Sequence, residues 1–133
     1  MIYTAQEVFD FVKEEDVKFI RLAFCDTLGR QKNISILPSE LRRAFEDGIS
    51  FDASAICGFG GAEKSDLLLF PDPSTLNILP WRPSHGKVVR MFCDIRHPDG
   101  TPFSRDTRAI LRRAVADAKA AGITVQFGAE IEF

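Results

Sequence analysis

The sequence contains no apolar run long enough to span a lipid bilayer, and its basic residues do not outnumber its acidic ones. With 17 Lys and Arg against 19 Asp and Glu, the formal net charge is −2, which excludes the strongly basic surface typical of nucleic-acid-binding proteins. The N-terminus carries acidic residues early, which is not the pattern of a secretory signal peptide. We therefore expect a cytoplasmic protein that binds neither membranes nor nucleic acid.

Cysteine is also scarce, and no cysteines or histidines have the spacing of a zinc site. The three cysteines, Cys25, Cys57 and Cys93, are an odd number, and two of them lie in apolar runs. Buried free thiols in a reducing compartment are the simplest interpretation. The GFGG stretch at 58–61 is not followed by Lys-Ser or Lys-Thr, so it does not have the pattern of a phosphate-binding loop.

What is present indicates one globular domain, because 133 residues with a hydrophobic content of 45% can bury a real core. Thr4 and Glu7 have the spacing of a capping box, which predicts the start of a first helix. Pro38 is expected to begin a second helix that ends at Gly48. Strands are expected where apolar residues alternate or cluster between turn signals, at 17–25, 31–37, 67–70, 76–79 and 87–95.

This order of elements predicts an α+β fold, a small mixed sheet with one helix packed on it, which resembles a β-grasp. The stretch 97–104 is the expected boundary of this domain, which would therefore comprise residues 1–100. Ser104 is expected to cap another long helix, and residues 123–133 are expected to form one more strand. Because one helix and one strand cannot bury both faces of the strand, residues 101–133 are interpreted as the beginning of a second, truncated domain.

Four acidic residues are candidates for a functional site. Glu130 and Glu132 alternate in the last predicted strand, so their carboxylates would share one face, roughly 7 Å apart, either to hold divalent cations or simply to be solvated. Asp52 opens the irregular, glycine-containing stretch 51–66, where it would either serve a functional loop or cap a turn. Asp66 begins a strand, where an acid can also act merely as a guard against aggregation.

The basic side chains indicate no site of their own. The two histidines, His85 and His97, lie in Pro- and Gly-containing stretches and are expected in surface loops rather than as a catalytic pair. Several arginines fall on predicted helices and are interpreted as ordinary solvated faces. These arginines are Arg42, Arg43, Arg112 and Arg113.

Six segments of the sequence together carry a resemblance to a known family. In order along the chain they read VKFIRLAFCDTLGRQKNISI, FDASAICGF, KSDLLLFPDPST, PWRPSHGKVVRMFCDI, HPDGTPFSRDTRAIL and FGAEIEF. No single segment is specific, but their combination resembles the N-terminal part of a type I glutamine synthetase. The resemblance extends over nearly the whole chain.

The resemblance implies a fold, an activity and a set of site residues. Glutamine synthetases join glutamate and ammonium with ATP through a γ-glutamyl phosphate, require Mg²⁺ or Mn²⁺, and consist of an N-terminal β-grasp domain and a larger catalytic domain. They are homo-oligomers of stacked rings with active sites between subunits. By this resemblance, Glu130 and Glu132 would be metal ligands. Asp52 would be the catalytic, ammonium-binding carboxylate donated to a neighbouring subunit, and Asp66 would belong to the same ammonium site.

Two departures from the family pattern bear on this expectation. The family's FDGSS is FDASA at residues 51–55, and its GPEPEF is GAEIEF at 128–133, where both acids are retained. The altered first motif leaves open a γ-glutamyl–amine ligase of the same fold, which takes a larger amine than ammonium. A stand-alone β-grasp interaction module without catalysis is a third interpretation. The chain alone is expected to be inactive, since the family's other metal, nucleotide and glutamate contacts lie beyond residue 133.

Overall fold

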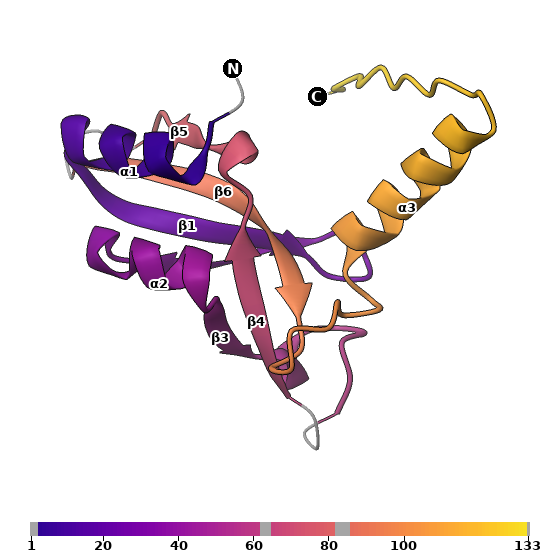
Figure 1. Cartoon of the computed structure of the whole chain (residues 1–133), viewed down its shortest axis with the longest axis horizontal. Coiled ribbons are helices and arrows are strands. Elements are labelled where there is room, and N and C mark those ends of the chain that lie inside the picture. Colours follow the sequence, from indigo (N-terminus) through magenta and orange to yellow (C-terminus); the bar gives the residue numbers. More distant parts are fainter. Residues whose placement is uncertain (1–2, 62–64, 82–85, 133) are drawn as a thin grey trace.

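The computed structural model describes residues 3–61, 65–81 and 86–132, and within these ranges it has one mixed sheet of six strands. The strand order is β2-β1-β6-β4-β3, and β5 pairs with β6 beside this path (Figure 1). The strands are β1 (Val17–Cys25), β2 (Gln31–Ile36), β3 (Ile49–Asp52), β4 (Asp66–Pro71), β5 (Asn77–Leu79) and β6 (Lys87–Arg96). The α-helices are α1 (Ala5–Glu14), α2 (Leu41–Glu46) and α3 (Thr107–Ala120). In these ranges no helix has the length and apolar character needed to cross a bilayer.

Helix α1 begins where the capping-box pattern predicts. The Thr4 hydroxyl accepts a hydrogen bond from the Glu7 backbone N–H at 3.3 Å, and the Glu7 carboxylate accepts one from the Thr4 backbone N–H at 2.7 Å. These bonds satisfy two N–H groups that the first turn of a helix leaves without partners. The hydrogen bonds from Thr4 also hold the pKa of Glu7 below its ordinary value. The predicted helix start is therefore confirmed.

Strands β1 and β6 pair in parallel at the centre of the sheet, and β2 returns antiparallel to β1 as a hairpin. Every second residue of β6 is buried, in the order Val89, Met91, Cys93 and Ile95. These side chains form one core with residues of α1 and α2, and Phe9 of α1 lies with its ring 5.7 Å from that of Phe45 in α2. The α+β architecture expected from the sequence is thus confirmed, with two helices rather than one packed on the sheet.

Strand β3 was not expected, because its residues belong partly to the stretch predicted to be irregular. Ile49 and Phe51 are buried while Ser50 and Asp52 are exposed, so the alternation of a strand is present over four residues. Four residues are the shortest alternation that indicates a strand, and this one overlaps the glycine-containing stretch; its pairing with β4 makes it a strand. The order β4-β3 at this edge of the sheet is a consequence of tertiary contacts.

Two expectations for the C-terminal region are wrong. The N-cap of α3 is Asp106 and not Ser104: Asp106 is 2% exposed, and its carboxylate accepts from the Arg108 N–H at 3.0 Å and from the Ile95 N–H at 3.1 Å. Asp106 is the N-cap because its carboxylate accepts hydrogen bonds both from the first turn of the helix and from the end of β6. Residues 123–132 are not a strand, since they have no neighbouring strand among the described residues; residue 133 lies outside those residues.

Helix α3 projects away from the sheet, on the side of the molecule opposite to α1 and α2 (Figure 1). None of its residues is buried, and three apolar side chains, Ile110, Leu111 and Val115, are 47%, 56% and 49% exposed. In the segment that follows, Phe127 and Ile131 are each 85% exposed. The core of the molecule therefore involves the sheet, α1 and α2, and it does not include α3.

Amide exchange should report this division. Backbone amides of residues 107–132 should exchange much faster than those of residues 17–36, because local opening of α3 exposes no buried side chain. Hydrogen exchange followed by NMR or mass spectrometry measures the difference, on a sample shown to be monomeric by light scattering, since self-association would cover the apolar side chains of α3. Equal protection of the two ranges in the monomer would contradict this prediction.

Candidate functional site

The candidate site is an acidic pair at the end of β3. In the antiparallel pairing of β3 with β4, Asp52 lies directly opposite Asp66, and both residues are exposed. The preceding pair in the register, Phe51 and Leu67, is buried, so the two acids face away from the core. Like charges directly opposite each other on neighbouring strands repel, which makes this position favourable for a bound cation. The structure thus brings together two of the four acids selected from the sequence.

Asp52 also caps a turn. Its Oδ1 atom accepts a hydrogen bond from the Ser54 backbone N–H at 2.8 Å, at the start of the 3-10 turn η2 (Ala53–Ala55). The hydrogen bonds from Ser54 hold the pKa of Asp52 below its ordinary value, so this carboxyl is ionised at neutral pH. The turn uses one carboxylate oxygen, so capping leaves the second oxygen available to a ligand. The two roles set as alternatives from the sequence are therefore compatible.

The alanines of FDASA fit the backbone at this position. Ala53 is 2% exposed, and its N–H donates to the Ser65 carbonyl at 2.7 Å, which ties the start of the turn to the residue before β4. The turn η2 is right-handed 3-10 backbone, which any L-residue can adopt, so it does not require the glycine of the family pattern. Ala55 is exposed and places no hydroxyl near Asp52.

The loop that follows Asp52 is held in place from two other parts of the chain. The Thr27 hydroxyl, in the turn between β1 and β2, donates to the Cys57 carbonyl at 3.1 Å. The Arg105 guanidinium, from the segment before α3, donates to the Gly58 carbonyl at 2.7 Å. Phe59 is 4% exposed and packs between the rings of two other phenylalanines. The described part of this glycine-containing loop is therefore anchored; residues 62–64 lie outside the described residues.

Gly58 makes the close approach of this loop to the β1–β2 turn possible. Its φ is +81°, and a Cβ atom at this position would lie 2.0 Å from the Thr27 Oγ1 atom. No side chain fits there, so the contact depends on glycine. In the sequence, GFGG gave no indication of this contact, because the partner residue is 31 positions away and belongs to another element.

Glu130 and Glu132 do not join the acidic pair in this chain. Both are exposed in the segment after α3, which runs at the opposite end of the molecule from the β3 end of the sheet (Figure 1). Nowhere in the described ranges do three or more His, Cys, Asp or Glu side chains gather closely enough to hold a metal ion. The two glutamates by themselves therefore do not fit a complete metal centre.

Two expectations for histidine and cysteine residues can be compared with the structure. The His97 ring is half-buried against Phe103, at a centroid distance of 5.6 Å, while His85 lies outside the described residues. Cys93 is buried, and this burial raises the pKa of its thiol, so the group is unreactive at neutral pH. Cys57 is exposed and Cys25 is half-buried, so only one of the three thiols is fully enclosed.

A charged cluster at the start of α3 was missed by sequence reasoning. Arg112, which was interpreted as part of a solvated face, donates to the Asp94 carboxylate on β6, and Arg108 donates to both Asp94 and Asp72. Arg42 and Arg43 do lie on an exposed helix face, as expected. No spacing in the sequence relates the three elements that supply this cluster, so only the fold reveals it.

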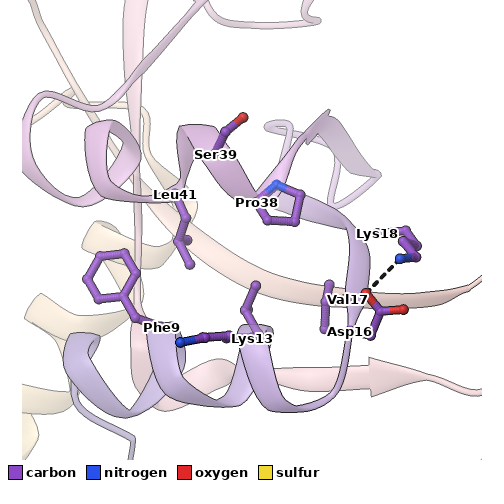
Figure 2. A pocket seen from close by; sticks show the side chains of 9 residues that line it. Phe9, Lys13, Asp16, Val17, Lys18, Pro38, Ser39 and Leu41 are labelled. Atoms are coloured by element: carbon purple, nitrogen blue, oxygen red, sulfur yellow. Dashed lines mark hydrogen bonds and ion pairs between the residues drawn. The ribbon is translucent and has the colours of Figure 1, made fainter.

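A groove of about 600 Å³ lies between α1 and the residues that precede α2. Figure 2 shows its apolar side chains, among them Phe9 and Leu41, with the ion pair of Lys18 and Asp16 (2.6 Å) at its edge. None of the four acids selected from the sequence lines this groove. It is therefore separate from the candidate site.

Comparison with known proteins relates this fold to one family. A family model described as the glutamine synthetase β-grasp domain matches residues 16–98. The chain is 47% identical over 131 residues to a glutamine synthetase of Clostridium saccharobutylicum and 48% identical over 130 residues to one of Methanosarcina mazei. Each match covers 98% of this chain but only 30% and 29% of these relatives, so the chain spans less than a third of their length.

Solved structures show the same likeness. A structure of GmaS in complex with ADP is similar with a TM-score of 0.76 and 26% identity, covering 91% of this chain and 26% of that one. A cryo-EM structure of Plasmodium falciparum glutamine synthetase is similar with a TM-score of 0.79, covering 90% of this chain and 23% of that one; at 24% identity it supports the fold alone. The β-grasp fold expected from the sequence is confirmed by the family match and these structures.

Substitution of Gly58 should separate two contributions to the loss of stability, the clash with Thr27 and the strain of a positive φ angle. Gly58→Ala should lower the free energy of unfolding by about 1–3 kcal/mol, because the new Cβ atom meets Thr27 and the φ angle is positive. Gly29→Ala is the matched control: its φ is +77°, but a Cβ atom there has nothing within 4 Å, so only the backbone cost of about 1 kcal/mol should appear. Urea unfolding measures both, and equal losses would show that the contact with Thr27 is unimportant.

Proposed function

Because the chain belongs to the glutamine synthetase family through its β-grasp domain, we propose that it is the N-terminal part of a ligase that joins ammonium to glutamate. The reaction uses ATP and proceeds through γ-glutamyl phosphate. The observation that carries the proposal is the pairing of Asp52 with Asp66 at the end of β3, within a chain that matches this family along nearly its whole length. The proposal places the protein in the cytoplasm, where glutamate, ammonium and ATP are available.

In this proposal, Asp52 and Asp66 bind the ammonium ion. Two exposed carboxylates that repel each other are both stabilised when a cation lies between them or beside them. The lowered pKa of Asp52 keeps its charge at neutral pH, and its hydrogen bond to Ser54 fixes the direction of the carboxylate. A carboxylate in contact with ammonium can also accept the proton that ammonium must lose, since ammonia is the nucleophile. Asp52 is thus the proposed catalytic residue.

The proposed domain division follows the same family comparison. Residues 1–100 are the β-grasp domain, and residues 101–133 are the beginning of the catalytic domain. Glu130 and Glu132 are proposed as two ligands of Mg²⁺ or Mn²⁺, ions that neutralise phosphate oxygens in phosphoryl transfer when bound. The remaining ligands would come from residues outside this chain, which fits the absence of a third ligand beside them in the described ranges.

The proposed assembly is a homo-oligomer in which Asp52 serves a neighbouring subunit. Within this chain, the β3 end of the sheet and the segment with Glu130 and Glu132 lie at opposite ends (Figure 1). One copy of the chain therefore does not bring the ammonium-binding acids to the metal-binding acids. A partner subunit that supplies one set to the other resolves this separation, and it agrees with the stacked rings implied by the family resemblance.

A γ-glutamyl–amine ligase is the second candidate, favoured by one observation. Ala55 is exposed where the family pattern has serine, so one hydroxyl is missing from the turn that Asp52 caps. A less polar turn is better suited to an amine that carries an alkyl group. The third interpretation is a binding module without catalysis. In that case, no acidic residue needs to contact a substrate.

The isolated 133-residue chain should show no ligase activity. The two exposed glutamates and the acidic pair lie far apart (Figure 1), and no three metal-ligating side chains gather in the described ranges to hold the ions that ATP chemistry needs. The purified chain is assayed for glutamine formation and for ATP hydrolysis in the presence of Mg²⁺ or Mn²⁺. Turnover above the level without protein would contradict this prediction.

A chimeric enzyme tests the role of Asp52. The matching N-terminal segment of the Clostridium saccharobutylicum glutamine synthetase is replaced by this chain, and Asp52→Asn is introduced. Asn still caps the turn, so the Tm should hold, whereas loss of the charge should raise the KM for ammonium and lower kcat by about 10²-fold or more. Asp66→Asn should give a smaller change in the same direction.

Asp47→Asn is the matched control, because Asp47 is an exposed acid of the same domain that lies outside the pair. Its kinetics should equal those of the unmodified chimera. If Asp52→Asn leaves the ammonium dependence unchanged, Asp52 has only its turn-capping role. A higher kcat/KM for methylamine than for ammonium in the unmodified chimera would favour the amine ligase, and a folded but inactive chimera would overturn both ligase proposals.

A further inference from the structure

We propose that a cluster of four charged side chains fixes the direction of α3 against the sheet and so makes the junction between the two proposed domains rigid. The cluster, here called the junction cluster, consists of Asp72, Asp94, Arg108 and Arg112. It joins three parts of the chain: the residue that follows β4, the C-terminal part of β6 and the first two turns of α3.

Arg108 is the bridging residue of the junction cluster. Its Nε atom donates to Asp94 Oδ1 at 3.3 Å, and its Nη2 atom donates to Asp72 Oδ2. The guanidinium is planar and rigid, so two donors directed at two carboxylates define an orientation and not merely a distance. Arg112 lies one helical turn further and donates to Asp94 as well, which gives α3 a second point of attachment along its axis.

The acids of the junction cluster are themselves held in place. Asp72 Oδ1 accepts from the Ser74 N–H at 3.0 Å and from the Ser74 hydroxyl at 2.6 Å. Burial raises the pKa of Asp72, but the hydrogen bonds from Ser74 and the charge of Arg108 outweigh this effect, so its pKa lies below the ordinary value. Asp94 belongs to strand β6 and lies opposite Phe70 in the antiparallel pairing with β4, which fixes its backbone.

Three side chains of the junction cluster are partly shielded from water. Arg108, Asp72 and Asp94 are 25%, 23% and 25% exposed, and the Arg108 guanidinium lies 5.9 Å from the centre of the Phe92 ring. Ion pairs on a fully exposed surface contribute little because water and salt screen them, whereas partly buried, two-donor pairs are screened less. This arrangement therefore differs from the exposed pair of Arg42 and Glu46 on α2.

Asp106 fixes where α3 begins, and the junction cluster fixes where it points. The buried Asp106 carboxylate bonds the Arg108 N–H at the start of the helix and the Ile95 N–H at the end of β6. A single anchor of this kind would still allow the helix to swing about its first turn. Since no residue of α3 is buried, apolar packing does not prevent this motion, and the contacts of Arg108 and Arg112 with the sheet are left to do so.

The consequence for function rests on the proposed ligase. Helix α3 leads into the segment that carries Glu130 and Glu132, while the sheet carries Asp52 at the end of β3. A rigid junction would hold the proposed catalytic domain at one angle to the β-grasp domain of the same chain. Arg108 is in this sense a positioning residue, because it contacts neither of the proposed acidic sites.

Residual dipolar couplings of the full 133-residue chain measure the orientation directly. In the wild-type chain, the couplings of α3 and those of the sheet, fitted separately, should give alignment tensors of the same orientation and magnitude. Arg108→Gln should reduce the tensor magnitude of α3 below that of the sheet, because the helix then samples several directions. Arg112→Gln should produce the same effect to a smaller degree, and it provides a second variant if Arg108→Gln fails to fold.

Two further variants separate positioning from charge. Arg113→Gln removes the same charge from the neighbouring position, outside the junction cluster, and should leave one common tensor. Arg108→Lys keeps the charge but cannot donate to Asp72 and Asp94 with one planar group, so it should behave as Arg108→Gln does. The Tm should fall more in Arg108→Gln than in Arg113→Gln, because loss of Arg108 leaves the partly buried carboxylates of Asp72 and Asp94 without this partner.

The proposal is overturned if Arg108→Gln and Arg112→Gln both retain one common tensor, if Arg113→Gln loses it equally, or if Arg108→Lys fully retains it. These couplings are measured on the chain without substrate. An inactive chimera would therefore contradict the proposed ligase without affecting this result, and the loss of the common tensor does not depend on any activity.

Discussion

The parallel pairing of β1 with β6 is the interaction from which the positions of the other elements follow. Its register places Ile20 beside Val89 and Leu22 beside Met91, and all four side chains are fully buried. Each such side chain stabilises the fold by about 1.5–3 kcal/mol relative to its exposed state. Parallel strands cannot be joined by a tight turn, so the chain between them must cross over, and it supplies β2, α2, β3 and β4 on the way.

Both acidic arrangements of the molecule depend on this central pair. Strand β1 ends in the turn whose Thr27 contacts the loop after Asp52, so the register of β1 determines where that loop can lie. Strand β6 presents Asp94 on the face away from the core, and the N–H of Ile95, the residue before its last, donates to the Asp106 carboxylate. The same strand pair thus directly positions Asp94, which binds arginines of α3. It positions the opposed acids on β3 and β4 indirectly, through the loop that follows Asp52.

The contrast between these two groups of acids is informative. In the junction cluster every carboxylate has an arginine, so its charge is neutralised within the chain. Asp52 and Asp66 oppose each other at the edge of the sheet, and Asp52 accepts a hydrogen bond from the Ser54 N–H of its own turn. The acids of the junction cluster are neutralised by arginines, whereas Asp52 and Asp66 face each other. This difference separates acids with a structural role from those that are candidates for binding a ligand.

The sequence by itself determined the helix at Thr4, most of the strands, the α+β class and the four candidate acids, because capping boxes and alternation act within a few residues of the chain. It also determined the family, through six segments that are specific only in combination. Only the tertiary structure decided that Ile49–Asp52 is a strand, that Asp52 faces Asp66, and that Asp106 rather than Ser104 begins α3. It also decided that Arg108 and Arg112 bind the sheet and that residues 123–132 have no strand partner among the residues that the structure describes. In each of these cases the outcome depends on whether another element lies beside the residue, and a local pattern carries no information about which distant residue will be its neighbour.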